Sequence, residues 1–264
     1  MKTISKLCFI LVGFTFASCQ WSVKPKEDKE VFKDTLRYST NGLTTFPATL
    51  PGQPANHKDT VVKASYVVFD GQPRLNDSVM QKLSGIFTNG NADIKYLRSA
   101  SKFLQAYADY LKKHAGWTVH AYAKVLMQDS SITTLEVGGY TYQGGAHGSS
   151  GTYFINWNTK ANRSITLNDL FVDGYTNKLK AIAESIFRKD EKLSDTSSLA
   201  RDYFFKDNKF ALNDNFSVTP IGLKFVYNQY EIKPYAAGIT ALFIPYSQIK
   251  SLLRPNSVVG KFIK

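Results

Sequence analysis

The fold is decided by WTVHAYAKVLM at residues 117–127, ITTLEVGGYTY at 132–142 and TYFINWN at 152–158. Each stretch is short and rich in aromatic and β-branched residues, and turn-forming residues separate it from the next, a pattern typical of β-strands. Strands that are joined by such short connections pair antiparallel. The sequence therefore predicts an antiparallel meander in the middle of the chain.

The residues before the meander predict one more strand and two helices. Residues 61–69, VVKASYVVF, precede the turn-forming DGQP and predict a strand. Residues 75–87 predict a helix with Asn76 or Asp77 as its N-cap. In residues 97–114 apolar side chains recur every three or four positions, which predicts a second helix.

The residues after the meander predict both helices and strands. A helix at 177–192 has an apolar stripe opposite a basic face, as expected of a helix with one buried side. The other predicted elements are a short helix at 199–205, a strand segment at 215–230 with a turn at 220–222, a strand at 239–244 and a closing helix at 246–253. From residue 58 onward the chain could form one large α+β domain or two small, closely packed ones.

The first residues have the order of a bacterial signal peptide, with two lysines before a run of ten apolar residues at 7–16 and two small residues after it. Residues 16–19, FASC, resemble the bacterial lipobox, in which a lipid is attached to the cysteine and cleavage makes that cysteine the new N-terminus. We therefore expect residues 1–18 to be a lipoprotein signal peptide and Cys19 to be lipidated. The protein would then be anchored by this lipid on the extracytoplasmic face of a bacterial membrane.

The alternative is ordinary signal-peptidase cleavage after Ala17. The two cysteines of the chain favour the lipoprotein, because Cys8 leaves with the signal peptide and Cys19 alone remains. An unpaired thiol is a liability in an oxidising compartment unless it is modified. Residues 19–57 contain several prolines and mixed charges without periodicity, so we expect a flexible stalk with a span of roughly 35 Å. The folded part should begin near Lys58.

The formal charge of +12 narrows the choice of partners. Loss of Lys2 and Lys6 with the signal peptide would leave +10, which is still strongly basic. Nucleic acid is not expected outside the membrane, so an anionic envelope glycan or an acidic protein is the natural partner of such a charge. The charge is spread along the chain, and no basic tract marks a site.

Two segments carry the candidate site residues. In YTYQGGAHG at 140–148, Gly144 and Gly145 allow positive φ, and exposed N–H groups beside His147 could bind an anion. In YEIKPYAAG at 230–238, Glu231 and Tyr235 border a turn that contains proline and glycine.

These two segments, together with SITLNDLF at 164–171 and IPY at 244–246, resemble the C-terminal domain of the anti-sigma factor RsiV, a family among the catalogued domains of unknown function. The preceding region is similar to the small N-terminal module of RsiV and of the peptidoglycan deacetylase PdaC. The resemblance implies an α+β fold in which a small β-α module at 58–130 is packed with a larger domain of antiparallel strands and several helices at 131–264.

The resemblance also implies a binding or sensing role, since this region of RsiV binds lysozyme. A lysozyme-like partner is disfavoured by charge, because common lysozymes are themselves basic. We expect no control of a sigma factor, because the sequence has no matching cytosolic segment or transmembrane helix. The deacetylase domain of PdaC has no counterpart here either.

The sequence offers no recognisable catalytic, metal or cofactor motif. The four histidines and two cysteines form no metal-binding pattern, and there is no nucleophile elbow or phosphate-binding loop. We therefore expect a lipid-anchored binding module and no enzyme. One alternative is a peptidoglycan hydrolase or esterase in which His147 acts as a base that Glu231 orients. Another is a purely structural envelope lipoprotein.

Overall fold

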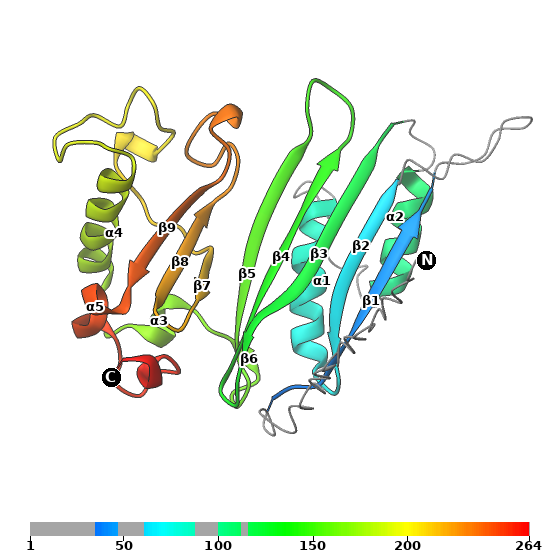
Figure 1. Cartoon of the computed structure of the whole chain (residues 1–264), viewed down its shortest axis with the longest axis horizontal. Helices are drawn as coiled ribbons and strands as arrows, with labels where there is room; N and C mark the ends of the chain where they lie inside the picture. Colours follow the sequence, from blue (N-terminus) through cyan, green and yellow to red (C-terminus); the bar gives the residue numbers. More distant parts are fainter. Residues whose placement is uncertain (1–34, 47–60, 88–99, 112–115, 264) are drawn as a thin grey trace, which may run out of the picture. The chain divides into compact units, whose positions relative to one another are not determined.

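The computed structural model describes residues 35–46, 61–87, 100–111 and 116–263 (Figure 1). In this part the chain forms two β-sheets and five α-helices, which confirms the α+β class. Cys19, the signal peptide and most of the expected stalk lie outside the described residues. None of the described helices has the length and apolar character needed to cross a membrane.

The first sheet has six strands, which lie side by side in their sequence order. They are β1 (Tyr38–Thr45), β2 (Val62–Phe69), β3 (Thr118–Gln128), β4 (Ile132–Tyr142), β5 (Ser149–Asn158) and β6 (Arg163–Ser164). The predicted meander is confirmed, because β3, β4 and β5 pair antiparallel. Only β2 and β3 run parallel.

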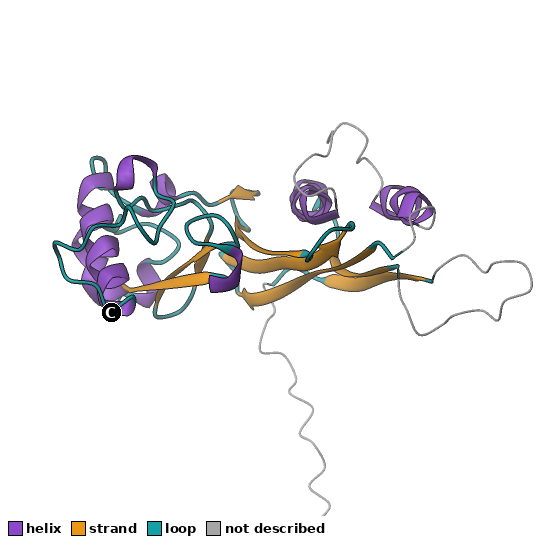
Figure 2. Cartoon of the chain, turned by 90° about the horizontal axis from the view of Figure 1, so that it is seen from above, coloured by secondary structure: helices purple, strands orange, loops and turns teal. Residues whose placement is uncertain are grey.

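Two helices, α1 (Pro73–Phe87) and α2 (Ala100–Leu111), lie on the same side of this sheet (Figure 2). They agree with the two predicted helices. Helix α1 packs on β2 to β5 and buries Leu75, Leu83 and Phe87 against them. Since successive side chains of a strand point to opposite faces, the other face of the sheet carries the intervening residues. We call it the open face.

The predicted N-cap of α1 was wrong, because the helix already begins at Pro73. Proline fits the first helical position, where its missing N–H costs no hydrogen bond. The amide of Asn76 instead accepts from the N–H of Phe69 at 2.8 Å and donates to its carbonyl oxygen at 2.9 Å. It therefore ties the helix to the end of β2.

The prediction that residues 19–57 are all stalk was also wrong, since β1 lies inside this range and pairs with the whole of β2. Seven of its eight residues remain at least partly exposed, so the strand lacks the buried face that gives a strand its apolar alternation. Its backbone pairing with β2 leaves no mark in the sequence pattern.

The second sheet contains β7 (Phe216–Val218), β8 (Gly222–Tyr227) and β9 (Thr240–Pro245), all antiparallel. Around it lie α3 (Leu167–Leu170), α4 (Thr176–Asp190) and α5 (Tyr246–Ile249). The predicted apolar stripe of α4 is confirmed in part: Leu179 and Ala183 are buried, and Phe187 joins them in the core. This sheet therefore has an apolar core of its own.

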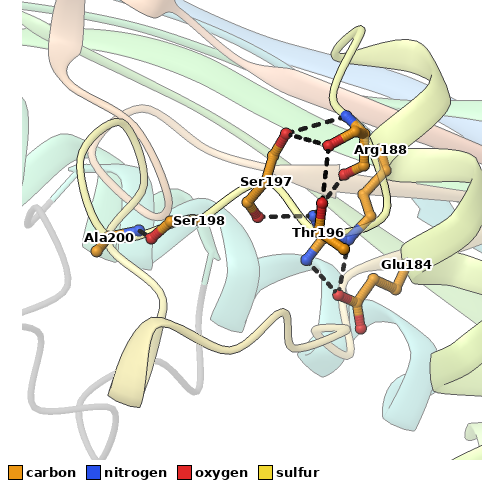
Figure 3. A network of polar contacts seen from close by, with 7 residues as sticks. Glu184, Arg188, Thr196, Ser197, Ser198 and Ala200 are labelled. Carbon is orange, nitrogen blue, oxygen red and sulfur yellow. Dashed lines mark hydrogen bonds and ion pairs between the residues drawn. The ribbon is translucent and has the colours of Figure 1, made fainter.

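The helix predicted at 199–205 is absent, and turns occupy this segment. The guanidinium of Arg188 donates to the carbonyl oxygens of Ser194 and Ser197 and pairs with Glu184 at 2.8 Å (Figure 3). Further along, the N–H of Phe204 donates to the carbonyl oxygen of Ile232. Arg188 thus holds the backbone just before this segment and Ile232 holds Phe204 within it, so tertiary contacts override the local helix propensity.

Side-chain amides join the two sheets. Asn156 of β5 accepts from the N–H of Val218 and donates to the carbonyl oxygen of Phe216, both at 2.8 Å. The side-chain amide of Asn215 accepts from the N–H of Phe154 at 3.1 Å and donates to the carbonyl oxygen of Thr152 at 2.8 Å. Residues 130 and 131, the expected module boundary, lie in the connection between the paired strands β3 and β4. The buried residues of the two apolar cores divide the chain near residue 160, except that Ile132 belongs to the second core.

Candidate functional site

The predicted glycine loop connects β4 to β5. Gly144 and Gly145 have φ values of +88° and +93°, which side chains rarely adopt. The hydroxyl of Tyr142 donates to the carbonyl oxygen of Gly145 at 2.9 Å and closes the loop. At Gly148 an added Cβ would lie 2.4 Å from the ring of Tyr140. The loop therefore needs glycine at these three positions for backbone or packing reasons.

The structure brings His147 and Tyr235 together, although they lie 88 residues apart in the sequence. Their rings stack with centroids 3.9 Å apart and an angle of 14° between the planes. Tyr230 lies against both, with its hydroxyl 3.4 Å from Nε2 of His147 and its ring centroid 5.6 Å from that of Tyr235. We call these three side chains the aromatic cluster.

Glu231, the remaining candidate, forms its hydrogen bonds with residues outside the aromatic cluster. Its Oε1 accepts from the side-chain amide of Asn213 at 2.6 Å, and its Oε2 accepts from the backbone N–H of Asn228 at 2.7 Å. The hydrogen-bond contacts of His147 with other described residues are to Tyr230 and to the carbonyl oxygen of Gly148. The carboxylate therefore holds a turn and does not bond to the imidazole.

The sequence reasoning missed Tyr230 as a site residue. Its φ is +64°, in the left-handed region that a bulky residue seldom occupies. The residue is nevertheless 54% exposed. The backbone of Tyr230 therefore carries strain and presents its side chain to solvent.

A second feature, also missed, is a pair of side-chain rows that cross the open face. Residues that lie opposite each other on neighbouring strands share a face, so register defines each row. The first row is Lys63, His120, Tyr140 and Ser150. The second row is Ser65, Tyr122, Gly138 and Thr152. Each row takes one residue from each of β2, β3, β4 and β5.

All residues of these two rows except Gly138 line a cavity of about 490 Å³ on the open face. Gly138 explains part of its shape, because an added Cβ there would lie 2.6 Å from the hydroxyl oxygen of Tyr122. The ring of Tyr122 can therefore lie close to the sheet and leave space above it. The walls combine two tyrosine rings with the hydroxyls of Ser65, Ser150 and Thr152.

Beside the cavity, the charged side chains of Glu136 and Lys124 pair with each other. Glu136 accepts from the hydroxyl of Tyr122 at 2.8 Å and pairs with Lys124 at 2.9 Å. Burial raises the pKa of Glu136, but hydrogen bonds from Lys124 and Tyr122 outweigh it and leave the pKa below its ordinary value. Burial and the bond to Glu136 together raise the pKa of Tyr122 to about 12. Tyr122 is therefore a neutral hydrogen-bonding group at physiological pH.

Lys63 differs from Lys124, because no other described residue pairs with it. Its side chain is exposed at the edge of the cavity, next to His120 in the first row. A basic group with no partner in a concave, hydroxyl-lined site is suited to an anionic group of a ligand.

The cavity and the aromatic cluster share a border. Tyr140 lines the cavity and touches Gly148, which directly follows His147. Ser150 ends the first row, and its backbone N–H donates to the side chain of Gln229, which directly precedes Tyr230, at 2.9 Å. The two features are thus neighbours, linked through Tyr140 and Ser150, and we treat them as one candidate site.

Metal coordination has no evident support in the described part of the chain, where no three histidine, cysteine, aspartate or glutamate side chains gather. What the site offers is stacking surfaces, hydroxyls and basic groups. Such groups are the kind that contact sugars and anions in proteins.

Residues 168–247 match a protein-family model described as "Protein of unknown function (DUF3298)". No curated protein matches the chain. Two solved structures are similar over most of both chains. A DUF3298 family member from Bacteroides fragilis NCTC 9343 has 21% identity and a TM-score of 0.62, with 86% of this chain and 97% of that chain covered.

The second structure is a DUF3298 family protein from Pseudomonas aeruginosa PAO1, with 22% identity and a TM-score of 0.65. The match covers 84% of this chain and 95% of that one. At such identity the likeness concerns the fold. The chain thus has the fold of solved DUF3298 family proteins, and its residues 168–247 form a DUF3298 domain.

Proposed function

We propose that this chain is a lipid-anchored binding module of the bacterial cell envelope whose open face binds an acidic glycan. The observation that supports this most directly is the cavity, in which two tyrosine rings and three hydroxyl side chains surround a concave surface beside Lys63. Sugars stack on aromatic rings and exchange hydrogen bonds with hydroxyls, and an acidic sugar adds a carboxylate for the lysine.

The charge of the chain supports the same class of ligand. The excess of basic residues attracts anionic polymers over a distance of about 8 Å at physiological salt. Near the cavity, the carboxylate of Glu136 is already shared by Lys124 and Tyr122. An incoming carboxylate would therefore meet Lys63 and His120 rather than an unneutralised acidic group.

The test is isothermal titration of the purified chain with oligogalacturonate, with a neutral malto-oligosaccharide of equal length as the control ligand. We expect salt-sensitive binding of the acidic sugar only. Lys63→Gln should weaken it roughly tenfold, the usual effect of losing one charged hydrogen bond. Lys178→Gln makes the same charge change on the exposed side of α4 and should leave the affinity unchanged.

Absence of binding by the unaltered chain would overturn the proposal. Equal losses in the two lysine variants would also contradict it, because they would show that net charge alone attracts the polymer.

A hydrolase is disfavoured because both carboxylate oxygens of Glu231 have partners other than His147. We expect no turnover of peptidoglycan fragments or acetylated sugars above background. Turnover that disappears in both His147→Ala and Glu231→Gln, while both variants stay folded, would replace binding with catalysis as the function.

The anchoring part of the proposal rests on the lipobox-like sequence at residues 16–19 and on Cys19 being the one cysteine left after loss of the signal peptide. Metabolic labelling of producing cells with a palmitate analogue should mark the protein, and Cys19→Ser should abolish the label. Label that persists in Cys19→Ser would refute lipidation at this position.

A further inference from the structure

The backbone of Tyr230 points to a role for the aromatic cluster beyond packing. With φ of +64° it is strained, yet the residue gains little burial in return, since Tyr230 is 54% exposed. Strained residues persist where the surrounding structure holds them in place, and they concentrate at binding sites. The strain therefore needs an explanation other than core packing.

The turn that carries Tyr230 is firmly held. The N–H of Glu231 donates to the carbonyl oxygen of Asn228 at 3.1 Å, and the Glu231 side chain accepts from the N–H of Asn228 at 2.7 Å. The amide of Asn228 in turn accepts from the N–H of Thr152 at 2.7 Å. These bonds fix the position of the Tyr230 ring relative to β5, which forms one wall of the cavity.

The cluster also has the shape of a binding surface. His147 and Tyr235 stack at 3.9 Å, so each ring can offer a ligand only its outer face, and Tyr230 lies beside the pair with an inter-ring angle of 38° to Tyr235. The imidazole and two phenolic hydroxyls place polar atoms at its edge. Flat aromatic surfaces with polar rims suit the alternating apolar and hydroxyl faces of sugars.

We propose that the aromatic cluster is a second sugar subsite, so that the ligand is an extended acidic oligosaccharide which continues from the cavity past Tyr140 and Gly148 onto Tyr230. This inference rests on the glycan-binding function proposed above. It adds that affinity depends on ligand length, because a short sugar fills the cavity without reaching the cluster.

The test compares di-, tetra- and hexagalacturonate by isothermal titration of the full chain. For the unaltered protein we expect affinity to rise with length. Tyr230→Asn removes the ring while retaining a residue type that tolerates positive φ. This variant should bind the dimer normally and lose roughly threefold to tenfold of its affinity for the hexamer, as expected for one aromatic contact.

Tyr38→Asn is the matched control, because Tyr38 is 45% exposed on β1 at the outer edge of the sheet; it should bind every ligand as the unaltered chain does. Lys63→Gln should weaken all lengths by the same factor. If the dimer binds and Tyr230→Asn behaves like the unaltered chain at every length, the second subsite is refuted while glycan binding stands. If no length binds, both proposals fail.

Discussion

The carboxylate of Glu231 accepts a hydrogen bond from the backbone N–H of Asn228 at 2.7 Å, and it thereby closes the turn that presents Tyr230. Glu231→Gln leaves a single acceptor oxygen for two donors, Asn213 and Asn228, so one bond is lost. We expect a loss of stability of about 1 kcal/mol, since the site is exposed. Thermal unfolding measures it. Asp190→Asn, at the exposed end of α4, should change stability by less than about 0.5 kcal/mol, and an unchanged melting temperature in Glu231→Gln would contradict a structural role.

Gly145→Val should destabilise the β4–β5 loop through the backbone alone. At Gly145 φ is +93°, and an added Cβ would meet no atom within 4 Å. We therefore expect the free energy of unfolding to fall by about 1–3 kcal/mol, because of backbone strain and not because of a steric clash. Gly85→Ala is the control, because this helical position also has open space and alanine should stabilise the helix by up to about 1 kcal/mol. A melting temperature that stays constant in Gly145→Val while ligand binding is lost would instead identify the loop as a recognition element.

Asn156→Ala should weaken the joint between the two sheets. The Asn156 side chain is buried, and its removal leaves the N–H of Val218 and the carbonyl oxygen of Phe216 without their partner. Two buried polar groups that lack hydrogen-bond partners together lower the free energy of unfolding by about 2–4 kcal/mol. Urea unfolding would measure this loss. Asn158→Ala removes only the bond to the exposed N–H of Ala161, so an equal loss in both variants would argue against the joint.

Asp169 should make stability depend on pH in the acid range. Its bond with Arg163 outweighs burial and, helped by bonds from Thr166, lowers the pKa of Asp169 to about 2. Because the folded pKa lies below the unfolded value of about 3.9, the stabilisation is complete above about pH 4 and is lost as the pH falls toward 2. Because the pair is largely exposed, we expect this stabilisation to be at most about 1 kcal/mol.

Urea unfolding of the unaltered chain and of Asp169→Asn at pH 5 and at pH 2.5 isolates this contribution from those of other carboxylates. The variant should be less stable at pH 5, and the difference should shrink at pH 2.5. A difference that is the same at both pH values would show that the Asp169 carboxylate is not the titrating group.

Binding to a basic lysozyme should be weak or absent. The expected charge of +10 after removal of the signal peptide would slow the encounter of two basic proteins. Titration with hen egg-white lysozyme at low and physiological salt provides the measurement. Tight binding that does not depend on salt would show that local complementarity prevails over net charge.

Local sequence patterns predicted the elements that bury an apolar face. The meander strands and helices α1, α2 and α4 all have such a face, and all are present. Strand β1 was not predicted, because most of its side chains are exposed and give no apolar alternation. The predicted helix at 199–205 was wrong because Arg188 and Ile232 hold the backbone of this segment and its neighbours in other hydrogen bonds.

The site was predicted only in part, for a similar reason. Unusual local composition pointed to Gly144, Gly145, His147 and Tyr235, and the last two do meet in space. Glu231 was noticed for the same reason, but its oxygens bond to Asn213 and Asn228. Lys63, His120 and Tyr122 have no distinctive neighbours in sequence, so nothing local singled them out.

The sequence by itself determined which side chains face away from α1 and α2, because alternation along a strand has a fixed period of two residues. Only the tertiary structure decided which of these side chains become neighbours. The parallel pairing of β2 with β3 sets Lys63 beside His120, and the connection of α1 and α2 between these strands leaves their register to packing over the whole sheet. The register between β2 and β3 cannot be predicted from local sequence, since it depends on how both helices pack on all the strands together.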